Sequence, residues 1–346
     1  MSIPHIRYMQ RCLELARQGN GYTAPNPMVG CVIVYNDFII GEGFHAIFGD
    51  PHAEVEAIKS VAAENRHLLG LTTLYVNLEP CSYFGKTPPC SDLIIETGIP
   101  KVVVAGLDPN PKVSGEGIKH LKDAGIDVTQ GILEAEAFEL NKRFYTFHQK
   151  KRPYIVLKWA QSADGYIGKA GRRVTISNAL SHRLAHKWRS EEQAIFVGYQ
   201  TAISDDPQLN TRMWSGQNPV RITLDGDLSL SENLKLFRSD GKLIIFSYKA
   251  HPDQANILYR QMDDSKDIIP QILHTLYAEN IISVLVEGGA KTLQSFIDSG
   301  LWDEGKVITS PKLFGKGVKA PILHNLQASL PEDILDDSLK IYLNPS

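Results

Sequence analysis

The sequence predicts an α/β protein made of two domains. Its 346 residues are enough for about two domains of ordinary size. Segments with strand character alternate with segments of helical periodicity in both halves, a pattern typical of layered α/β folds. Between the halves, the run Gln149-Lys150-Lys151-Arg152-Pro153 is charged and ends in proline, as linkers often do. We therefore expect domains at residues 1–147 and 153–346.

In the first half, each expected element follows from periodicity or from turn residues. Apolar residues between Tyr8 and Ala16 have helical spacing, and Asn36-Asp37 marks a hairpin turn. The next helix spans 52–63, and a further one begins near Cys90. The expected strands are 30–35, 38–40, 73–78 and 101–105.

The second half repeats this alternation. Short apolar runs predict its strands, and 3.6-residue periodicity predicts its helices. We expect residues 231–239 and 249–266 to form surface loops or short helices. The expected strands are 154–159, 194–197, 220–225, 242–247, 283–286 and 306–309, and the expected helices are 178–190, 268–279 and 290–299.

Composition and charge exclude several classes of protein. The net charge is −3 and there is no large basic block, so nucleic acid is not an expected partner. The N-terminus lacks an apolar signal core, and no apolar run approaches the ~20 residues of a membrane span. We expect a cytoplasmic protein without a membrane partner that acts on a small molecule. The sequence does not give an oligomeric state, and a homo-oligomer is the working expectation.

The most informative residues are His52, Glu54, Cys81 and Cys90. One imidazole and two thiolates are the ligands of a catalytic zinc that keeps its fourth position for water. Glu54, two residues after His52, would then move protons rather than bind the metal. The ligands are expected at helix starts, where the helix dipole favours thiolate. This set predicts hydrolytic removal of an amine from an aromatic ring.

The alternatives to a catalytic zinc are a closed zinc site or no metal. A closed site needs a fourth Cys or His nearby, and His45 is the only near candidate. The remaining cysteines, Cys12 and Cys31, lie in apolar runs and are expected to be core thiols.

Several stretches of the first half resemble one family. Eight residues separate Cys81 from Cys90, whereas the general zinc deaminase pattern has two between its cysteines. The segment 79–90, together with 26–30, 51–55 and 108–111, is similar to the deaminase domain of the bifunctional riboflavin-biosynthesis deaminase–reductases. The resemblance covers residues ~5–145. It implies a cytidine-deaminase-like α/β/α domain that deaminates a phosphoribosylaminopyrimidinone.

The resemblance also implies contacts with that substrate. Asn26 would hold the pyrimidine, and His45 and Lys86 would face the ribose phosphate. From the residues alone, Asn26 could equally be a turn residue before Pro27, and Lys86 a solvated loop lysine.

The second half contains Glu287-Gly288-Gly289-Ala290 where a strand meets a helix. Paired glycines before a helix can hold a phosphate, although a plain tight turn is at least as common. No G-x-G-x-x-G pattern follows a strand, which argues against a Rossmann domain. The stretches 158–165, 197–209 and 221–225 resemble the reductase domain of the same family. That resemblance implies a dihydrofolate-reductase-like α/β domain over ~153–343 that uses NADPH to reduce the ribosyl chain to ribityl.

The resemblance assigns two sets of residues in this half. Thr175 stands where the family often has a tryptophan near the nicotinamide. Arg189 could instead be a surface cation at a helix C-terminus. The implied cofactor-binding residues are Ala160, Thr175, Thr201, Gly226, Gly289, Ala290, Lys291, Thr292 and Leu293. The implied substrate-binding residues are Arg189, Asp205, Leu209, Arg212 and Glu287.

Three functions remain open at this point. The first is a bifunctional enzyme that carries zinc and NADPH and catalyses two steps of riboflavin synthesis. The second keeps an active deaminase and makes the other domain a binding or assembly module. The third, a nucleic-acid base deaminase, is disfavoured by the net charge and by the cysteine spacing.

Overall fold

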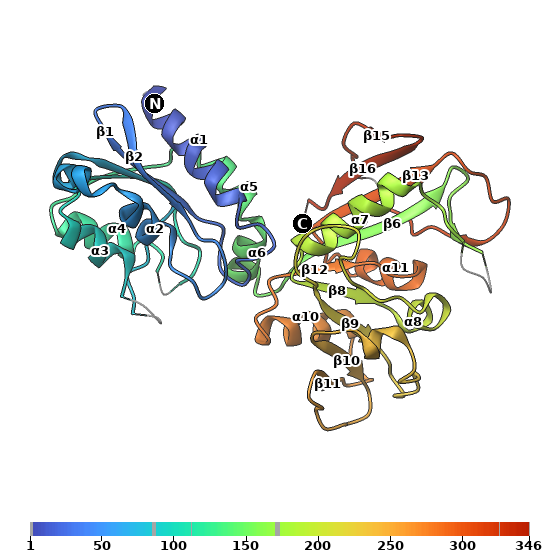
Figure 1. Ribbon diagram of the computed structural model, residues 1–346. Helices are drawn as coiled ribbons and strands as arrows, with labels where there is room; N and C mark the ends of the chain where they lie inside the picture. Colours follow the sequence, from blue (N-terminus) through green and yellow to red (C-terminus); the bar gives the residue numbers. More distant parts are fainter. Residues whose placement is uncertain (1–2, 85–87, 112, 170–173, 325, 346) are drawn as a thin grey trace. The chain divides into compact units, whose positions relative to one another are not determined.

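The structure of the protein is a computed structural model, which describes residues 3–84, 88–111, 113–169, 174–324 and 326–345 (Figure 1). The chain divides into two compact units, Met1–Lys150 and Lys151–Ser346, which are described separately. Within the described ranges, no helix has both the length and the apolar character needed to cross a membrane.

Unit 1 is built on a five-stranded mixed sheet with the strand order β2-β1-β3-β4-β5. Strand β1 runs antiparallel to both β2 and β3, and β3, β4 and β5 are parallel to one another. The carboxyl ends of β3 and β4 therefore meet at one edge of the sheet. The strands are β1 (Gly30–Tyr35), β2 (Phe38–Phe44), β3 (Thr73–Leu78), β4 (Lys101–Gly106) and β5 (Asp127–Gln130).

Helices cover both faces of this sheet because alternate strand residues are apolar on both sides (Figure 1). Leu74 and Val76 pack under α2, α3 and α4, whereas Tyr75 packs under α1 and α5. The result is an α/β/α sandwich with two cores. Its helices are α1 (Ile3–Arg17), α2 (Ala53–Ser60), the 3₁₀ helix η1 (Ala63–Leu71), α3 (Cys90–Thr97), α4 (Glu116–Asp123), α5 (Glu134–Leu140) and α6 (Lys142–Lys150).

The structure confirms the strands 30–35 and 73–78 and the helix start at Cys90. The helix expected over 52–63 is shorter, because α2 stops at Ser60 and a 3₁₀ helix follows. The elements α4, β5, α5 and α6 were not predicted. They are short segments whose apolar residues are interrupted by charged ones.

Unit 2 is built on a nine-stranded sheet with the order β11-β10-β9-β8-β12-β6-β13-β16-β15. All pairs from β11 to β13 are parallel, and β16 and β15 add antiparallel strands at one edge. Its strands are β6 (Tyr154–Ser162), β8 (Ala194–Val197), β9 (Val220–Leu224), β10 (Leu243–Ser247), β11 (Ile257–Gln261), β12 (Ser283–Val286), β13 (Glu304–Ser310), β15 (Glu332–Ile334) and β16 (Asp337–Leu343). A separate two-stranded ribbon pairs β7 (Tyr166–Gly168) with β14 (Val318–Lys319).

Helices also cover both faces of this sheet. The apolar sides of α10 and α11 pack on one face around Phe196 and Phe246, and α7 packs on the other around Val156 and Leu285. The helices α8 and α9 extend the second layer over β8 and β10. The helices are α7 (Ala179–Glu191), α8 (Tyr199–Asp205), α9 (Lys235–Arg238), α10 (Ile268–Ala278) and α11 (Ala290–Asp298).

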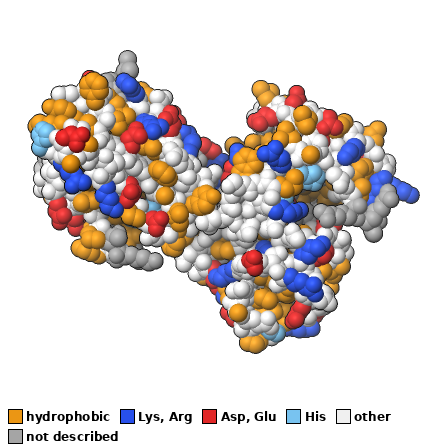
Figure 2. Space-filling model, in the orientation of Figure 1, with side chains coloured by type: hydrophobic (Ala, Val, Ile, Leu, Met, Phe, Trp, Pro, Cys, Tyr) orange, Lys and Arg blue, Asp and Glu red, His pale blue; other side chains and the backbone are white. Residues whose placement is uncertain are grey.

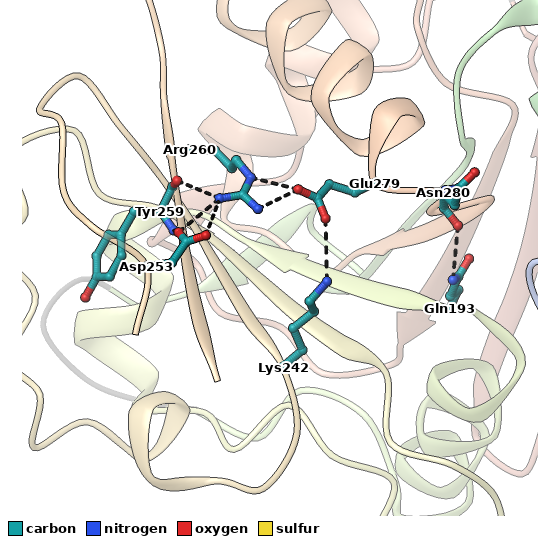
Figure 3. A network of polar contacts seen from close by, with 7 residues as sticks. All are labelled: Gln193, Lys242, Asp253, Tyr259, Arg260, Glu279 and Asn280. Atoms are coloured by element: carbon teal, nitrogen blue, oxygen red, sulfur yellow. Dashed lines mark hydrogen bonds and ion pairs between the residues drawn. The ribbon is translucent and has the colours of Figure 1, made fainter. Parts of the chain in front are cut away.

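The expectation for residues 249–266 is wrong in one respect, since this segment contains the edge strand β11. A polar network holds this strand against the end of α10 (Figure 3). Arg260 donates to Glu279 at 2.8 Å and to Asp253 at 3.0 Å, and Lys242 lies 3.5 Å from Glu279. Strand β11 is only partly buried, so its contacts give a weak periodic signal in the sequence.

The charged run 149–153 is not a solvated linker throughout. Arg152 is buried and forms a bidentate ion pair with Asp303, at 2.6 and 2.8 Å. Asp303 also accepts the backbone N–H of Ile155 at 2.8 Å, so the pair fixes the start of β6. Periodicity did not reveal this role because the partner lies 151 residues away.

We predict that Arg152→Ala destabilises unit 2 by about 3 kcal/mol, because it leaves the carboxylate of Asp303 buried without its cation. Urea unfolding, followed by circular dichroism, measures this change. The control is Arg183→Ala, which removes an exposed arginine from α7. Equal midpoints for the two variants would contradict a stabilising role for the Arg152–Asp303 pair.

Candidate functional sites

Three predicted metal ligands come together in unit 1. The ligand atoms of His52, Cys81 and Cys90 all lie within 4.8 Å of one another. His52 is the N-cap of α2, Cys90 is the first residue of α3, and Cys81 follows β3. The Nδ1 atom of His52 lies 3.3 Å from Sγ of Cys90 and 3.7 Å from Sγ of Cys81. Two helix starts and one strand end therefore build the cluster.

This donor set fits zinc. In a tetrahedral site with Zn–S near 2.3 Å and Zn–N near 2.0 Å, ligand atoms lie roughly 3.5 Å apart. The separations from His52 Nδ1 agree with that value without rearrangement. Three ligands from the protein would leave the fourth position of a bound metal open, as catalytic sites require.

Without a metal, hydrogen bonds make Cys81 the thiolate of the cluster. A hydrogen bond from the Cys90 thiol, followed by one from His52, lowers the pKa of Cys81 to about 4. The hydrogen bond with Cys81 raises the pKa of His52 to about 9. The hydrogen bond with Cys81, together with burial, raises the pKa of Cys90. The cluster therefore already holds one negative sulfur, which is the form that binds metal.

Glu54 lies in the first turn of α2, two residues after His52. Its side chain is buried, and burial raises the pKa of its carboxyl group. The side chain of Cys90 is one of the neighbours that act on this pKa. A buried carboxyl group with a raised pKa beside the cluster is suited to taking up and releasing a proton.

A second buried glutamate, which the sequence analysis did not single out, supports the cluster. Glu79 follows β3 directly, and its carboxylate accepts backbone N–H groups from Asp108, Gly115, Gly117 and Ile118 at 2.9–3.2 Å. These bonds connect the end of β3 to the loop after β4 and to the start of α4. No side chain fits at Gly117, because a Cβ there would lie 2.0 Å from the carbonyl oxygen of Pro80.

Asn26 and His45, both expected to contact substrate, form a pair. The Nδ1 atom of buried His45 lies 3.1 Å from the carbonyl oxygen of Pro51, which can only accept, so Nδ1 carries the proton. Burial lowers the pKa of His45, so the ring is neutral and Nε2 accepts from the Asn26 amide at 3.1 Å. This leaves the Asn26 carbonyl oxygen for a ligand. The third expected residue, Lys86, lies outside the described residues.

Two further asparagines position the loop that carries Asn26. Asn77 accepts the N–H of Gly30 at 2.7 Å and donates to the carbonyl of Met28. Asn141 accepts the N–H of Met28 and donates to the same carbonyl. Neither residue stood out in the sequence, because such bonds depend on distant segments coming together.

In unit 2, a cavity of about 520 Å³ opens beside the start of α11. Five of the expected cofactor-binding residues line it, namely Thr201 and the run Gly289–Thr292. Thr201 also accepts the N–H of Gly289 at 2.9 Å, which joins the two loops. A helix start with free amide groups is suited to a phosphate. The other lining residues are Ile167, Gly168, Lys169, Val174, Gln200, Ser204, Asp205 and Val318.

The other four expected cofactor residues lie elsewhere among the described residues. Leu293 is fully buried in the core under α11, so only its main chain could contact a ligand. Ala160 packs against the α7 side of the sheet, and Gly226 follows β9 with the ring of Tyr248 beside it. The carbonyl of Thr175 accepts from Lys312, and its neighbour Val174 reaches the cavity.

The expected substrate residues Arg189 and Glu287 form a largely buried bidentate pair, at 2.7 and 2.8 Å. Lys158 from β6 lies 3.7 Å from the same carboxylate. Burial acts to raise the pKa of Glu287, but the charges of Arg189 and Lys158 prevail and lower it to about 2. Arg189 is thus not a surface cation. Lys158 belongs to the same charged cluster, and it was not predicted from the sequence.

His186 lies next to this pair on α7. Burial, together with the charges of Arg189 and Arg212, lowers the pKa of His186 to about 4, so it is neutral. Its Nδ1 atom is buried and has no hydrogen-bond partner in the part of the chain that the structure describes. A neutral side chain here avoids adding a further cation.

The remaining expected substrate residues differ in position. Asp205 lines the cavity with Thr201. Arg212 is exposed and donates to the side chain of Asn210 at 2.9 Å. The side chain of Leu209 is buried in the core over β8 and β10, so any ligand contact would use its main chain.

Two family profiles match the chain. Residues 3–106 match the cytidine and deoxycytidylate deaminase zinc-binding region, and residues 153–333 match the RibD C-terminal domain. Each match falls within one of the two compact units.

Curated proteins and solved structures agree with these matches. The riboflavin biosynthesis protein RibD of Aquifex aeolicus is 42% identical over 317 residues, covering 90% of this chain and 88% of that protein. RibD of Escherichia coli is 34% identical over 330 residues, covering 90% and 89%. The crystal structure of a diaminohydroxyphosphoribosylaminopyrimidine deaminase/5-amino-6-(5-phosphoribosylamino)uracil reductase from Thermotoga maritima matches with a TM-score of 0.89 and 38% identity, over 99% of both chains. Acinetobacter baumannii RibD matches with a TM-score of 0.89 and 32% identity, again over 99% of both chains.

We predict that Cys81→Ser strongly reduces the zinc content of the purified protein, because serine removes a thiolate from the ligand set. Elemental analysis measures zinc per chain. Cys12→Ser is the matched control, since Cys12 is a buried thiol that donates to the carbonyl of Tyr75 and serine can keep that bond. Full zinc in Cys81→Ser would show that the ligand assignment is wrong.

Proposed function

The chain belongs to the RibD family of bifunctional riboflavin-biosynthesis enzymes, and from this premise we propose which residues carry each reaction. The protein is a zinc-dependent deaminase and an NADPH-dependent reductase. It deaminates 2,5-diamino-6-(5-phosphoribosylamino)pyrimidin-4-one and then reduces the ribosyl chain of 5-amino-6-(5-phosphoribosylamino)uracil to ribityl. The alternative with a non-catalytic second unit is contradicted by the match of residues 153–333 to the family's C-terminal domain.

In the deaminase half, His52, Cys81 and Cys90 hold zinc. The convergence of their ligand atoms within 4.8 Å is the observation that carries this proposal. A zinc ion bound there supplies a Lewis acid that activates water. Glu54 would take up the proton that the attacking water loses and deliver it to the leaving amine, because burial raises the pKa of its carboxyl group.

Asn26 recognises the pyrimidine ring in this proposal. His45 accepts from the Asn26 amide nitrogen, so the Asn26 oxygen points away from that bond and can accept from a ring N–H or an amino group. His45 orients Asn26 as a neutral hydrogen-bond partner, and a cationic contact with the ribose phosphate falls to Lys86.

In the reductase half, the cavity beside α11 would hold NADPH, and residues 289–292 would bind its phosphates. The cofactor supplies the hydride, and the protein aligns it with the substrate. Glu287 already occupies the guanidinium fork of Arg189, so Arg189 holds Glu287 in place for the substrate. Arg212, exposed nearby, meets the substrate phosphate. Asp205 faces the substrate from the wall of the cavity.

The partner of each unit is a small molecule in this proposal. Side chains of both charges are interspersed on the face shown in Figure 2, and the net charge is −3, which does not favour nucleic acid. A cytoplasmic setting suits free thiols that bind metal. A homo-oligomer stays a prediction that sedimentation velocity can check. Domains at 1–147 and 153–346 remain our assignment of the two activities.

We predict that Glu54→Gln keeps zinc but lowers deamination by at least ~10²-fold, the scale of general acid–base catalysis. Glutamine has the same shape but cannot accept and release the proton. Turnover of the diaminopyrimidinone measures the effect, and reduction of added deaminated intermediate is the internal control. If zinc were lost as well, Glu54 would be a ligand or a structural residue instead.

We also predict that Gly289→Val weakens NADPH binding. The backbone at Gly289 has φ −65°, which valine tolerates, but an added Cβ lies 3.1 Å from Thr201 Oγ1 and crowds the loop. Asp205→Asn keeps the shape of the cavity, so it should leave cofactor affinity near normal and slow reduction. Calorimetric titration of NADPH, with circular dichroism as the folding control, separates these outcomes. Unchanged affinity in folded Gly289→Val would contradict the phosphate assignment.

A further inference from the structure

The ribbon formed by β7 and β14 makes one wall of the cavity in unit 2. Ile167 and Gly168 from β7 and Val318 from β14 line this cavity together with the start of α11. The two strands of the ribbon follow β6 and β13, which are parallel neighbours with Ser162 opposite Ser310. The position of the ribbon therefore determines the width of the cavity between the ribbon and residues 289–292.

The ribbon is too short to hold its own position. Strand β7 has three residues and β14 has two, and isolated two-stranded ribbons are at best marginally stable in water. Its place must be fixed by contacts at its base. Two backbone bonds contribute, from Ala163 N to the carbonyl of Lys312 at 3.0 Å and from Ala320 N to that of Gly165 at 2.9 Å.

One carboxylate joins the bases of both strands. Asp164, in the turn between β6 and β7, accepts the N–H of Phe314 at 3.0 Å and that of Gly315 at 2.7 Å, both from the segment before β14. It also accepts the hydroxyl of Ser162 at 2.6 Å. The hydrogen bond from Ser162, followed by those from the two amides, lowers the pKa of Asp164 to about 2. This carboxylate is exposed, yet three donors of its own chain bind it.

The ribbon strands also approach each other closely. A Cβ at Gly317 would lie 2.2 Å from the carbonyl oxygen of Gly168, so only glycine allows this pairing. A small movement at the base would therefore shift the strand pair as a whole. Asp164 itself is not among the described residues that line the cavity.

We propose that Asp164 is a positioning residue for the reductase: by tying the 312–315 segment to the turn after β6, it fixes the cavity wall and so sets the affinity for NADPH. This inference rests on the assignment of the cavity to NADPH made above. Asp164 acts through the ribbon and does not touch the cofactor. Its loss releases a wall that must then be ordered when NADPH binds, and that ordering weakens binding.

The test compares Asp164→Ala with Asp263→Ala in the full-length protein. Asp263 is a matched control, because it is also exposed, accepts the N–H and hydroxyl of Ser265, and has its pKa lowered to about 2. It lies between β11 and α10 and is not among the described residues that line the cavity. Titration of NADPH gives Kd, steady-state reduction gives kcat and KM, and thermal unfolding reports stability.

We expect Asp164→Ala to raise Kd and KM for NADPH roughly three- to tenfold, as residues do that modulate a site without contacting its ligand. The value of kcat at saturating NADPH should change less, and deamination should not change. Asp164→Asn keeps one acceptor oxygen and should fall between wild type and Asp164→Ala. Asp263→Ala should bind NADPH as wild type does.

Three results would overturn the proposal, and they lead to two distinguishable conclusions. If Gly289→Val weakens NADPH binding but Asp164→Ala leaves Kd unchanged, the cavity assignment stands and the positioning role fails. The same conclusion follows if both aspartate variants only lower the unfolding temperature. If Gly289→Val has no effect on Kd, the cavity is not the NADPH site, and the inference falls with that assignment.

Discussion

Each unit depends on a carboxylate with little exposure to solvent, placed directly after a parallel strand. Glu79 follows β3, and Glu287 follows β12. A buried carboxylate is costly unless donors surround it, so the segments that supply those donors must fold into place around it. Backbone amides of the loop after β4 and of α4 surround Glu79, and the cations Arg189 and Lys158 surround Glu287.

The two solutions give the sites different electrostatic character. Backbone amides, which bring no compensating side-chain cation, bind the carboxyl group of Glu79 two residues from Cys81, and such surroundings suit a site for a metal cation. At Glu287, two cations face one carboxylate, and the neutral state of His186 keeps the excess small. That arrangement suits a substrate that carries a phosphate. The position directly after a parallel strand therefore holds a glutamate without cationic partners in unit 1 and a glutamate with two basic partners in unit 2.

The metal site could be predicted from the sequence because its chemistry needs specific residue types at specific spacings. His52, Cys81 and Cys90 have few alternative roles, and each adjoins a helix start or strand end that periodicity predicts. Contacts that join distant segments could not be found in this way. In the sequence, Lys158 is one residue of an apolar strand, and only the structure shows that it lies beside Glu287. Arg152 is likewise part of a charged run in the sequence, and only the structure shows its pair with Asp303.

The resemblance to a known family also did not reveal how each assigned residue could contact a ligand. The run Gly289–Thr292 and Thr201 line one cavity, because a strand–loop–helix junction has a defined geometry. Leu209 and Leu293 belong to the same stretches, but their side chains turn into the core. Position along a motif does not reveal which of its residues contact a ligand through the main chain alone.

The polar network of Figure 3 also has a consequence for the behaviour of the protein at high concentration. Strand β11 is the outer strand at one edge of a nine-stranded sheet, where another chain could add a strand. Arg260, held by Asp253 and Glu279, keeps charged groups along this edge. An approaching chain would have to strip water from those charges before it could pair. These three charged residues therefore oppose pairing at this edge, and they lie outside the residues proposed for either reaction, so selection for solubility can act on them independently of catalysis.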